Sequence, residues 1–253
     1  YDGTLCDEAR RFEPMPSEVA EELTRLLRLG LYVGVATGRG QSVRKQLQGS
    51  IPRVLWDRVI VGYYNGSDIG PLSANDQPDA TETPLEPLQP VAELLLRLRP
   101  FLGIEAPELR RNQITLKSGA FPVEQLWQRV QGLVAPHVFP GVAMLRSGHS
   151  VDILAPDVSK LAVVERVCEM AGCSEDEVLC IGDQGCWPGN DHALLGTPLS
   201  LSSNVVSADP ERCWNLAPAG VRESRATLGY LRLLKRSRGA VRVGFPSPRR
   251  KRT

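Results

Sequence analysis

The sequence lacks the features that mark several classes of protein. Its six cysteines form no Cys-x-x-Cys pair, and no His/Cys cluster has the spacing of a zinc site. In a chain of 253 residues, thiols scattered in this way indicate reduced cysteines and a cytoplasmic protein, not a disulfide framework. No apolar run approaches the roughly 20 residues that a membrane-spanning helix needs. We therefore expect no membrane partner.

The sequence also lacks a strong net charge, although its charges are unevenly placed. The whole chain carries +1, yet the stretch from Lys235 to Thr253 holds 8 Lys and Arg residues and no acid, so the remainder carries −7. A mildly acidic body is not typical of a nucleic-acid-binding protein, and we expect no nucleic-acid partner. The basic run predicts a solvated, disordered tail over residues 235–253. A tail that contacts RNA, DNA or anionic lipid remains the alternative.

The first 66 residues alternate between helical and strand patterns. Residues 31–36 and 58–62 are nearly continuous apolar runs, as expected for parallel strands that are buried on both faces. Residues 17–30 and 41–47 have the spacing of helices. This alternation predicts an α/β fold with a doubly wound, mostly parallel core sheet.

The middle of the chain has a different pattern. From Ser67 to about Leu88 the composition shifts to Pro, Asp, Asn, Ser and Thr, which indicates a connector leaving the core. Beyond it, residues 112–117 alternate between polar and apolar side chains, as a half-exposed strand does. Two further strands, at 142–145 and 149–154, flank a hairpin gap at Ser147-Gly148, and helices are expected over 90–98 and 122–134. This segment predicts a smaller α+β domain, with an antiparallel sheet and helices on one of its faces.

The core pattern resumes near Asp157. Expected elements are a helix over 160–171 closed by Gly172, a strand over 177–181, a helix starting at 190–195, a strand over 199–201 and a helix over 222–234. The chain is therefore divided into a first part of the core (1–66), an inserted domain (67–150), a second part of the core (151–234) and the basic tail (235–253).

Polar residues follow several of the predicted core strands. In open α/β sheets, ligands bind beyond the carboxyl ends of the strands, so these residues are expected to converge on one crevice. The groups are, in chain order, Asp2-Gly3-Thr4, Thr37-Gly38-Arg39, Asn65-Gly66, Lys160 at the start of a helix, and Gly182-Asp183 with Asn190-Asp191.

These groups, in this order, resemble the motifs of the haloacid dehalogenase (HAD) superfamily of aspartate-dependent phosphatases. The first motif of the family reads Asp-x-Asp-Gly-Thr, and this chain begins at the x. The resemblance therefore places the nucleophile one residue before Tyr1, after an opening strand. The 253 residues by themselves are expected to be inactive.

The place of the insertion resembles the C2-cap branch of the superfamily. That branch includes Cof-type sugar phosphatases, sucrose-phosphate and trehalose-phosphate phosphatases, and phosphomannomutase. The resemblance implies that the cap selects the substrate. Arg110, Arg111 and Lys117 lie near one predicted cap strand and are candidates for contact with an anionic or sugar group.

The resemblance also implies roles for individual residues. Asp2 is the expected general acid and then base, and its carbonyl the expected metal ligand. Thr37 is expected to hydrogen-bond the phosphoryl group, helped by the backbone N–H groups of Gly38 and Arg39. Lys160 is expected to neutralise charge at the phosphoryl group, and Asn65 to lie near it.

The expected cofactor is Mg²⁺, bound by Asp183 and Asp191 together with Asp2, with Asn190 supporting the pair. One departure from the family is the spacing of the two aspartates, which seven residues separate here, more than in the common family motif. The implied function is hydrolysis of a small phosphorylated metabolite, a sugar phosphate, through an aspartyl-phosphate intermediate. A sugar-phosphate mutase and a catalytically silent binding module remain the alternatives.

Overall fold

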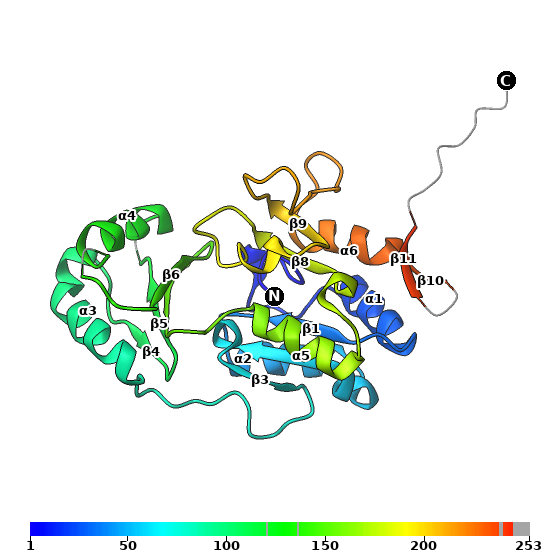
Figure 1. Cartoon of the computed structure of the whole chain (residues 1–253), viewed down its shortest axis with the longest axis horizontal. Helices are drawn as coiled ribbons and strands as arrows, with labels where there is room; N and C mark the ends of the chain where they lie inside the picture. Colours follow the sequence, from blue (N-terminus) through cyan, green and yellow to red (C-terminus); the bar gives the residue numbers. More distant parts are fainter. Residues whose placement is uncertain (120, 136, 238–239, 245–253) are drawn as a thin grey trace.

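The computed structural model describes residues 1–119, 121–135, 137–237 and 240–244. Two α/β units lie side by side: a core containing both ends of the described chain, and a smaller unit inserted between them, at the left of Figure 1. The α/β class expected from the sequence is confirmed. Within the described residues, no helix has the length and apolar character that crossing a bilayer requires.

The first core sheet has the order β1-β2-β3. Strands β1 (Val33–Ala36) and β2 (Val59–Tyr63) are parallel, and every residue of β2 is buried. Both were expected, because their apolar runs suit a strand covered on two faces. Strand β3 (Asp68–Pro71) pairs antiparallel with β2 and was not expected, because its Asp, Gly and Pro are residues typical of turns.

A second core sheet pairs β8 (Cys180–Gln184) with β9 (Ser200–Val205) in parallel. The prediction of one doubly wound sheet is thus confirmed only in part, since the described strands of the core form separate sheets. Residues 1–6 lie between the ends of β1 and β8 and form a turn. The amides of Thr4, Leu5 and Cys6 converge on the Tyr1 carbonyl at 2.7–3.3 Å, so this segment does not extend as a strand joining the two sheets.

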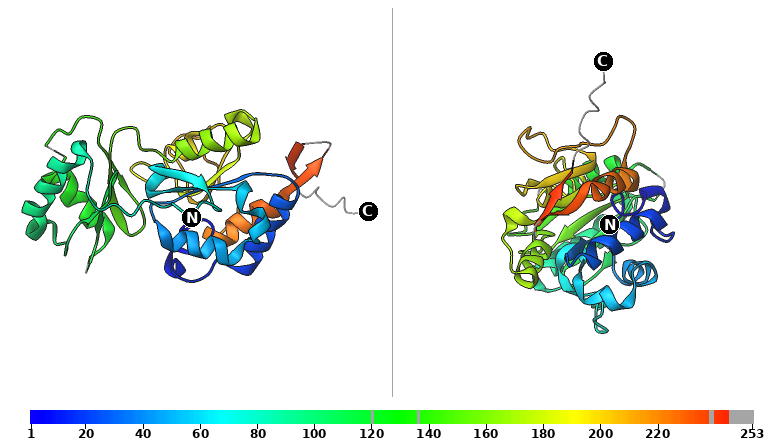
Figure 2. Two further views of the ribbon diagram at one scale, coloured as in Figure 1. Left: turned by 90° about the horizontal axis from the view of Figure 1, so that it is seen from below. Right: turned by 90° about the vertical axis from the view of Figure 1, so that its right-hand side faces the viewer.

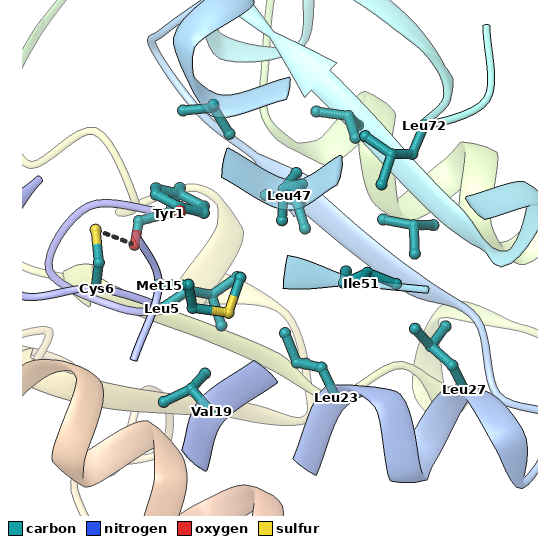
Figure 3. Packing of buried hydrophobic residues seen from close by; sticks show 14 of the residues in the cluster. Tyr1, Leu5, Cys6, Met15, Val19, Leu23, Leu27, Leu47, Ile51 and Leu72 are labelled. Carbon is teal, nitrogen blue, oxygen red and sulfur yellow. Dashed lines mark hydrogen bonds between the residues drawn. The ribbon is translucent and has the colours of Figure 1, made fainter. Parts of the chain in front are cut away.

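Helices cover both faces of the core. Figure 2 shows α5 (Leu161–Ala171) on one face, with α1 (Ser17–Arg28), α2 (Gln41–Ser50) and α6 (Glu223–Leu233) on the other. Helix α1 buries Val19, Leu23, Leu26 and Leu27, which recur at helical spacing. Figure 3 shows part of this cluster, in which Leu23 and Leu27 are drawn with apolar residues of α2 and of the chain start. Tyr1, Leu5 and Cys6, which flank the Asp-Gly-Thr sequence, are therefore part of the main hydrophobic core.

The inserted unit contains a four-stranded antiparallel sheet of order β4-β5-β7-β6. Its strands are β4 (Glu108–Leu109), β5 (Gln113–Lys117), β6 (Ala143–Arg146) and β7 (Ser150–Leu154), and its helices are α3 (Gln89–Leu102) and α4 (Val123–Leu133). Alternate residues Ile114, Leu116, Val151 and Ile153 are buried in one cluster with side chains of α3 and α4. The residues between them face the other way, toward the core. The prediction of an antiparallel sheet with helices on one face is confirmed.

Several expected boundaries differ in the structure. Strand β3 belongs to the core sheet and β7 to the inserted sheet, so the inserted unit begins after Pro71 and extends to Leu154, in place of the expected 67–150. The helix expected from 190–195 is wrong, since this stretch forms turns that end in a 3-10 turn at Leu194–Gly196. The 3-10 turns are Glu8–Arg10, Arg53–Arg58, Tyr64–Gly66, Glu86–Leu88, Glu175–Glu177 and Leu194–Gly196.

The predicted tail also differs at its start. Strands β10 (Leu234–Ser237) and β11 (Ala240–Val243) form an antiparallel hairpin, with Leu234 opposite Val243. Leu234 is buried in the main core, which anchors the hairpin to the fold. The disordered tail predicted from residue 235 is therefore wrong over these two strands. Residues 238–239 and 245–253 of the predicted tail lie outside the described residues.

Candidate active site

The turn at the start of the chain packs against the end of β8. Ser203 Oγ donates to the carbonyl oxygens of Gly3 (2.9 Å) and Gly182 (3.1 Å). Gly3 has a φ of 71°, and a Cβ atom added there would lie 2.5 Å from the carboxyl carbon of Asp183. Since only glycine tolerates both the conformation and the approach, the Asp-Gly-Thr sequence is what brings Asp2 beside Asp183.

Asp2 is held by an arginine. Its Oδ1 atom accepts a hydrogen bond from Arg39 Nη1 at 2.7 Å, and the two side chains are only 11–12% exposed. The same Nη1 atom donates to the Arg11 carbonyl at 2.6 Å, and the guanidinium lies 5.2 Å from the ring centre of Phe12. These contacts fix the Asp2 carboxylate at one wall of the site.

Thr37 joins the ends of two parallel strands. Its amide donates to the Gly62 carbonyl (2.9 Å), and its carbonyl accepts from the Asn65 amide (2.7 Å). Thr37 Oγ1 accepts from the Arg39 amide at 3.1 Å, so its own proton is left to donate. The Arg39 amide is thus already bonded and is not available for the phosphoryl contact expected from the sequence. Of the two backbone amides expected to contact the phosphoryl group, that of Gly38 remains a candidate.

Asn65 and Gly66 bring the end of β2 against the start of α5. Gly66 has a φ of 91°, and a Cβ atom there would lie 2.3 Å from the Ser159 carbonyl oxygen. Lys160 follows at the beginning of the helix, and its Nζ donates to Asp191 Oδ1 at 2.7 Å, with both side chains 6% exposed. A buried ion pair is therefore built from two segments 31 residues apart.

The two aspartates after β8 have different environments. Asp191 Oδ2 accepts the backbone amides of Asp183 (2.9 Å) and Gln184 (3.3 Å). Burial alone would raise the pKa of Asp191, but the charge and hydrogen bond of Lys160 and the hydrogen bond from the Asp183 amide hold that pKa below its ordinary value. Burial, followed by the charge of Asp191, raises the pKa of Asp183 to about 8.

These contacts test which residues fit a magnesium ion. Both carboxylate oxygens of Asp191 already accept hydrogen bonds, Oδ1 from Lys160 and Oδ2 from backbone amides. Asp191 is also absent from the described residues that line the cavity between the core and the inserted unit. Asp183, Asn190 and Asp2 do line it, and no hydrogen bond between described residues ends on the Asp2 carbonyl. A carboxylate, an amide and a carbonyl are hard oxygen donors that leave room for waters, as Mg²⁺ prefers. No group of three or more His, Cys, Asp and Glu side chains that could hold a metal ion occurs in the described residues, so a Mg²⁺ site here would combine the Asp183 carboxylate with the neutral oxygens of Asn190 and Asp2. The chemistry of this donor set fits Mg²⁺. The contacts of Asp191 favour a role as the anchor of Lys160 over a role as a metal ligand.

Comparison with known proteins gives no match to a family model or to a curated protein. Solved structures do match. A trehalose-6-phosphate phosphatase from Aspergillus fumigatus is 19% identical, with 92% of this chain and 89% of that chain covered and a TM-score of 0.54. A HAD subclass IIB sugar phosphatase is 18% identical, with 79% and 84% covered and a TM-score of 0.53. An IMP-nucleotidase from Plasmodium falciparum, truncated at its N-terminus and bound to IMP, is 12% identical, with 91% and 65% covered and a TM-score of 0.62.

The chain shares its overall fold with these phosphatases. We call the inserted unit, which contains β4 to β7 with α3 and α4, the cap. At these identities the likeness concerns the fold, so the chemistry of the site is argued from its own residues.

A cavity of about 390 Å³ lies between the core and the cap. Its floor contains the expected residues Asp2, Thr37, Lys160 and Asp183, which come from four separate segments. Its roof contains polar residues of the cap sheet, Gln113, Thr115, Lys117, Ser150 and Asp152. Of these roof residues, only Lys117 was a candidate from the sequence. The alternation of polar and apolar side chains along β5 and β7 is the signal that identifies the face on which the other four lie.

The cap residues that were singled out lie in different places. Arg110 lines the cavity and stacks on Tyr64, with 5.9 Å to the ring centre. Lys117 lines it too and pairs with Glu108. Arg111 is instead engaged with Asp79 at 3.6 Å and does not line the cavity.

Direct hydrogen bonds join the cap to the floor. Asn65 Nδ2 donates to Gln113 Oε1 (2.9 Å) and to Asp152 Oδ2 (3.3 Å), and Gln113 Nε2 donates to the Gly38 carbonyl (3.2 Å). Burial raises the pKa of the Asp152 carboxyl, and the bonds from Thr115 and Asn65 offset part of that effect. Asn65 Oδ1 is buried without a hydrogen-bond partner in the described part of the chain. Asn65 is thus aimed at the junction of floor and roof.

The lengthened loop between Asp183 and Asp191 also contacts the cap. The Arg146 amide donates to the Pro188 carbonyl (2.9 Å), and the Asn190 amide donates to the Arg146 carbonyl (3.0 Å). The additional residues therefore form a short bridge to the end of β6. This contact gives the unusual spacing of the two aspartates a structural reason.

Proposed function

We propose that this chain is a Mg²⁺-dependent phosphatase that acts on a small phosphorylated metabolite, a sugar phosphate, through an aspartyl-phosphate intermediate. The observation that carries the proposal is the convergence of Asp2, Thr37, Lys160 and Asp183 on the floor of one cavity under a polar cap sheet. The likeness to a trehalose-6-phosphate phosphatase and to a sugar phosphatase supports it at the level of the fold. The nucleophile in this proposal is an aspartate immediately before Tyr1.

The floor has the groups needed to bind a phosphoryl group. The ammonium of Lys160 neutralises phosphoryl oxygens, and its bond to Asp191 holds it in place. The Thr37 hydroxyl, free to donate, and the Gly38 amide are the neutral donors. A magnesium ion held by Asp183, Asn190 and the Asp2 carbonyl would neutralise further charge on the phosphoryl group.

Proton transfer is assigned to Asp2. The nucleophilic carboxylate attacks phosphorus, the bond from phosphorus to the sugar oxygen breaks, and Asp2 gives its proton to that oxygen. In the second step Asp2 takes a proton from water, which attacks the acyl phosphate and releases inorganic phosphate. The contact with Arg39 orients the Asp2 carboxyl group, which is protonated before the first step and ionised before the second.

The roof supports a hydroxylated leaving group. Gln113, Thr115, Ser150 and Asp152 offer an amide, two hydroxyls and a carboxylate on one face of the cap sheet. Such groups form hydrogen bonds with the hydroxyls of a sugar, and a site built in this way discriminates against substrates that leave them unpaired.

The proposal is tested with the chain including its native upstream residues. Phosphate release is measured from an aryl phosphate and a panel of sugar phosphates, with and without Mg²⁺. The variant Asp183→Asn is expected to lower the Mg²⁺-dependent rate by at least about 100-fold, a loss of some 3 kcal/mol of charge stabilisation. The matched control Glu165→Gln, at an exposed position of α5, is expected to keep the wild-type rate.

A second measurement needs no turnover. Calorimetric titration of residues 1–253 with Mg²⁺ is expected to show binding that Asp183→Asn abolishes. Release that is indifferent to Mg²⁺, or unchanged in Asp183→Asn, would contradict the proposal. Phosphoryl groups that remain on a rearranged product would identify a mutase instead.

A further inference from the structure

A glutamate of the core and a histidine of the cap form a pair at the edge of the cavity. His149 lies in the turn between β6 and β7, and Glu8 begins the 3-10 turn that follows the Asp-Gly-Thr turn. The distance from His149 Nδ1 to Glu8 Oε1 is 2.5 Å, across 141 residues of sequence. Both residues line the cavity, and their side chains are 26% and 28% exposed. Neither was singled out from the sequence.

Both members of the pair are held in position. Ser147 Oγ accepts the amides of His149 (3.2 Å) and Ser150 (3.0 Å), which fixes the turn. The Glu8 amide donates to Glu223 Oε2 at 3.0 Å, and Glu8 Oε1 also accepts from Arg11 Nη1 at 3.4 Å. A cavity edge with this much support is preorganised for a ligand.

Close packing of the backbone also favours the contact. A Cβ atom added at Gly148 would lie 3.1 Å from the carboxyl carbon of Glu8, so a glycine at this position lets the turn approach the carboxylate. The carboxylate therefore meets the cap at the residue next to His149.

The pair determines which nitrogen of the imidazole is free. Burial would raise the pKa of Glu8, but the hydrogen bond from His149 and the charge of Arg11 hold it below its ordinary value. An ionised carboxylate only accepts, so Nδ1 carries the proton and donates to it. Nε2 is then the nitrogen left for the cavity, as in other carboxylate–histidine pairs that fix a tautomer.

The position of the pair indicates which part of a substrate it meets. Lys160, Thr37 and Asp183, the groups assigned to the phosphoryl, belong to the floor, whereas His149 belongs to the cap and is followed on β7 by Ser150 and Asp152. A substrate whose phosphate occupies the floor therefore presents its leaving group to His149.

We propose that His149 is a specificity-determining residue whose Nε2 hydrogen-bonds a hydroxyl of a polyhydroxylated leaving group, and that Glu8 is the positioning residue that fixes its ring. This inference rests on the proposed phosphatase function. Because the core supplies Glu8 and the cap supplies His149, the subsite is complete only when the cap is seated on the core. Phosphate esters without hydroxyl groups gain nothing from it.

The first test is binding, measured by NMR of the imidazole nitrogens in residues 1–253. The chain has three histidines, so His149→Gln identifies the signal of interest. The free protein is expected to show the Nδ1–H tautomer at His149. Glucose 6-phosphate with Mg²⁺ is expected to shift the His149 signal, whereas phenyl phosphate and inorganic phosphate shift it much less. The signal of His137, which is exposed on the cap, is expected to stay unchanged with all three.

The outcomes separate the inference from the function on which it rests. If the three phosphates bind but glucose 6-phosphate and phenyl phosphate affect His149 equally, the specificity role is overturned and the phosphatase proposal stands. If none of them binds in the presence of Mg²⁺, the phosphatase proposal fails and the inference fails with it. A free protein with the Nε2–H tautomer at His149 also overturns the inference.

The second test is kinetic and uses the chain including its native upstream residues. His149→Gln is expected to raise KM for the best sugar phosphate by about 10- to 100-fold, as for one hydrogen bond to a charged or strongly polarised group. The value of kcat/KM for phenyl phosphate is expected to stay within about 2-fold, since that substrate makes no such bond. Glu8→Gln is expected to act in the same direction with a smaller effect, and Glu8→Asp to restore part of it. His137→Gln is the matched control.

If His149→Gln lowers kcat/KM equally for the sugar phosphate and for phenyl phosphate, the residue acts in the contact between cap and core or in the chemical step. That result would overturn the specificity role. Unchanged KM for every sugar phosphate would do the same. A fall in kcat alone, with KM constant, also contradicts a role in recognition of the leaving group.

Discussion

The buried pair of Lys160 and Asp191 provides the sharpest test of the structural reasoning. The two side chains are 6% exposed and meet at 2.7 Å. Lys160→Met keeps the length of the side chain and removes its charge, which leaves the Asp191 carboxylate buried beside an apolar group. Breaking a buried pair in this way costs about 3–5 kcal/mol. The two backbone amides that bond Asp191 Oδ2 remain, so the lower end of that range is expected.

The assay is urea or thermal unfolding of residues 1–253 at neutral pH. For a chain of this size, a loss of about 3 kcal/mol corresponds to a fall in Tm of roughly 6–12 °C. Asp191→Asn is expected to be destabilising as well, because Lys160 loses its partner. The double variant is expected to be more stable than the sum of the two losses predicts, with a coupling of about 1 kcal/mol or more.

The control is an exposed ion pair of similar length. Arg232 Nη2 and Glu18 Oε1 lie 2.8 Å apart, with side chains 53% and 62% exposed. Glu18→Gln is expected to change stability by less than about 1 kcal/mol. If Lys160→Met is no more destabilising than Glu18→Gln, or if the double variant shows no coupling, the assignment of Asp191 as the anchor of Lys160 is refuted.

Three further predictions concern contacts that connect the core, the cap and the candidate site. Gly3→Ala is expected to cost about 2 kcal/mol or more in unfolding free energy and to weaken Mg²⁺ binding, because its Cβ meets Asp183. Gly49→Ala lies inside α2, where the added Cβ meets no atom within 4 Å apart from its chain neighbours and the helix's own backbone, and is expected to stabilise the fold by about 0.5–1 kcal/mol. Equal effects of the two variants in denaturant titrations would contradict this. Gly189→Ala is expected to speed hydrogen exchange at the Arg146 and Asn190 amides, since its Cβ would lie 2.2 Å from the Gln184 carbonyl oxygen. If these amides are protected as well as they are in the control Gly132→Ala, the loop between Asp183 and Asp191 does not hold the end of β6 in this way. The pKa of Glu8 is lower in the folded state than its ordinary 4.5, so its ionised form stabilises the fold above about pH 4.5. The stability difference between wild type and Glu8→Gln is therefore expected to shrink as the pH falls below about 4.5 and through the folded pKa. A difference that stays constant from pH 7 to pH 4 in urea titrations would show that the pair with His149 does not form.

Local patterns in the sequence were sufficient for most of the elements. The spacing of Val19, Leu23, Leu26 and Leu27 predicted α1, and the apolar runs predicted β1 and β2, because periodicity reports which face of a segment is buried. The same rule predicted the antiparallel cap sheet. It failed at β3 and at the hairpin of β10 and β11, where pairing with a neighbouring strand outweighs local composition.

The residues of the floor were also readable from the sequence. Asp2, Thr37, Lys160 and Asp183 follow or precede predicted core elements, and the carboxyl ends of parallel strands meet at one edge of a sheet. Their grouping therefore depends on the order of strands and helices, which the sequence determines.

The partners of these residues were decided by the tertiary structure. Hydrogen bonds join Lys160 to Asp191, His149 to Glu8, and Asn65 of the core to Asp152 of the cap, over separations of 31, 141 and 87 residues. A sequence pattern fixes which face of an element a side chain occupies, but not what lies opposite that face. That depends on how the core sheets and the inserted sheet pack against one another, which for this protein places the polar roof of the cap over the floor that contains Asp2, Thr37, Lys160 and Asp183.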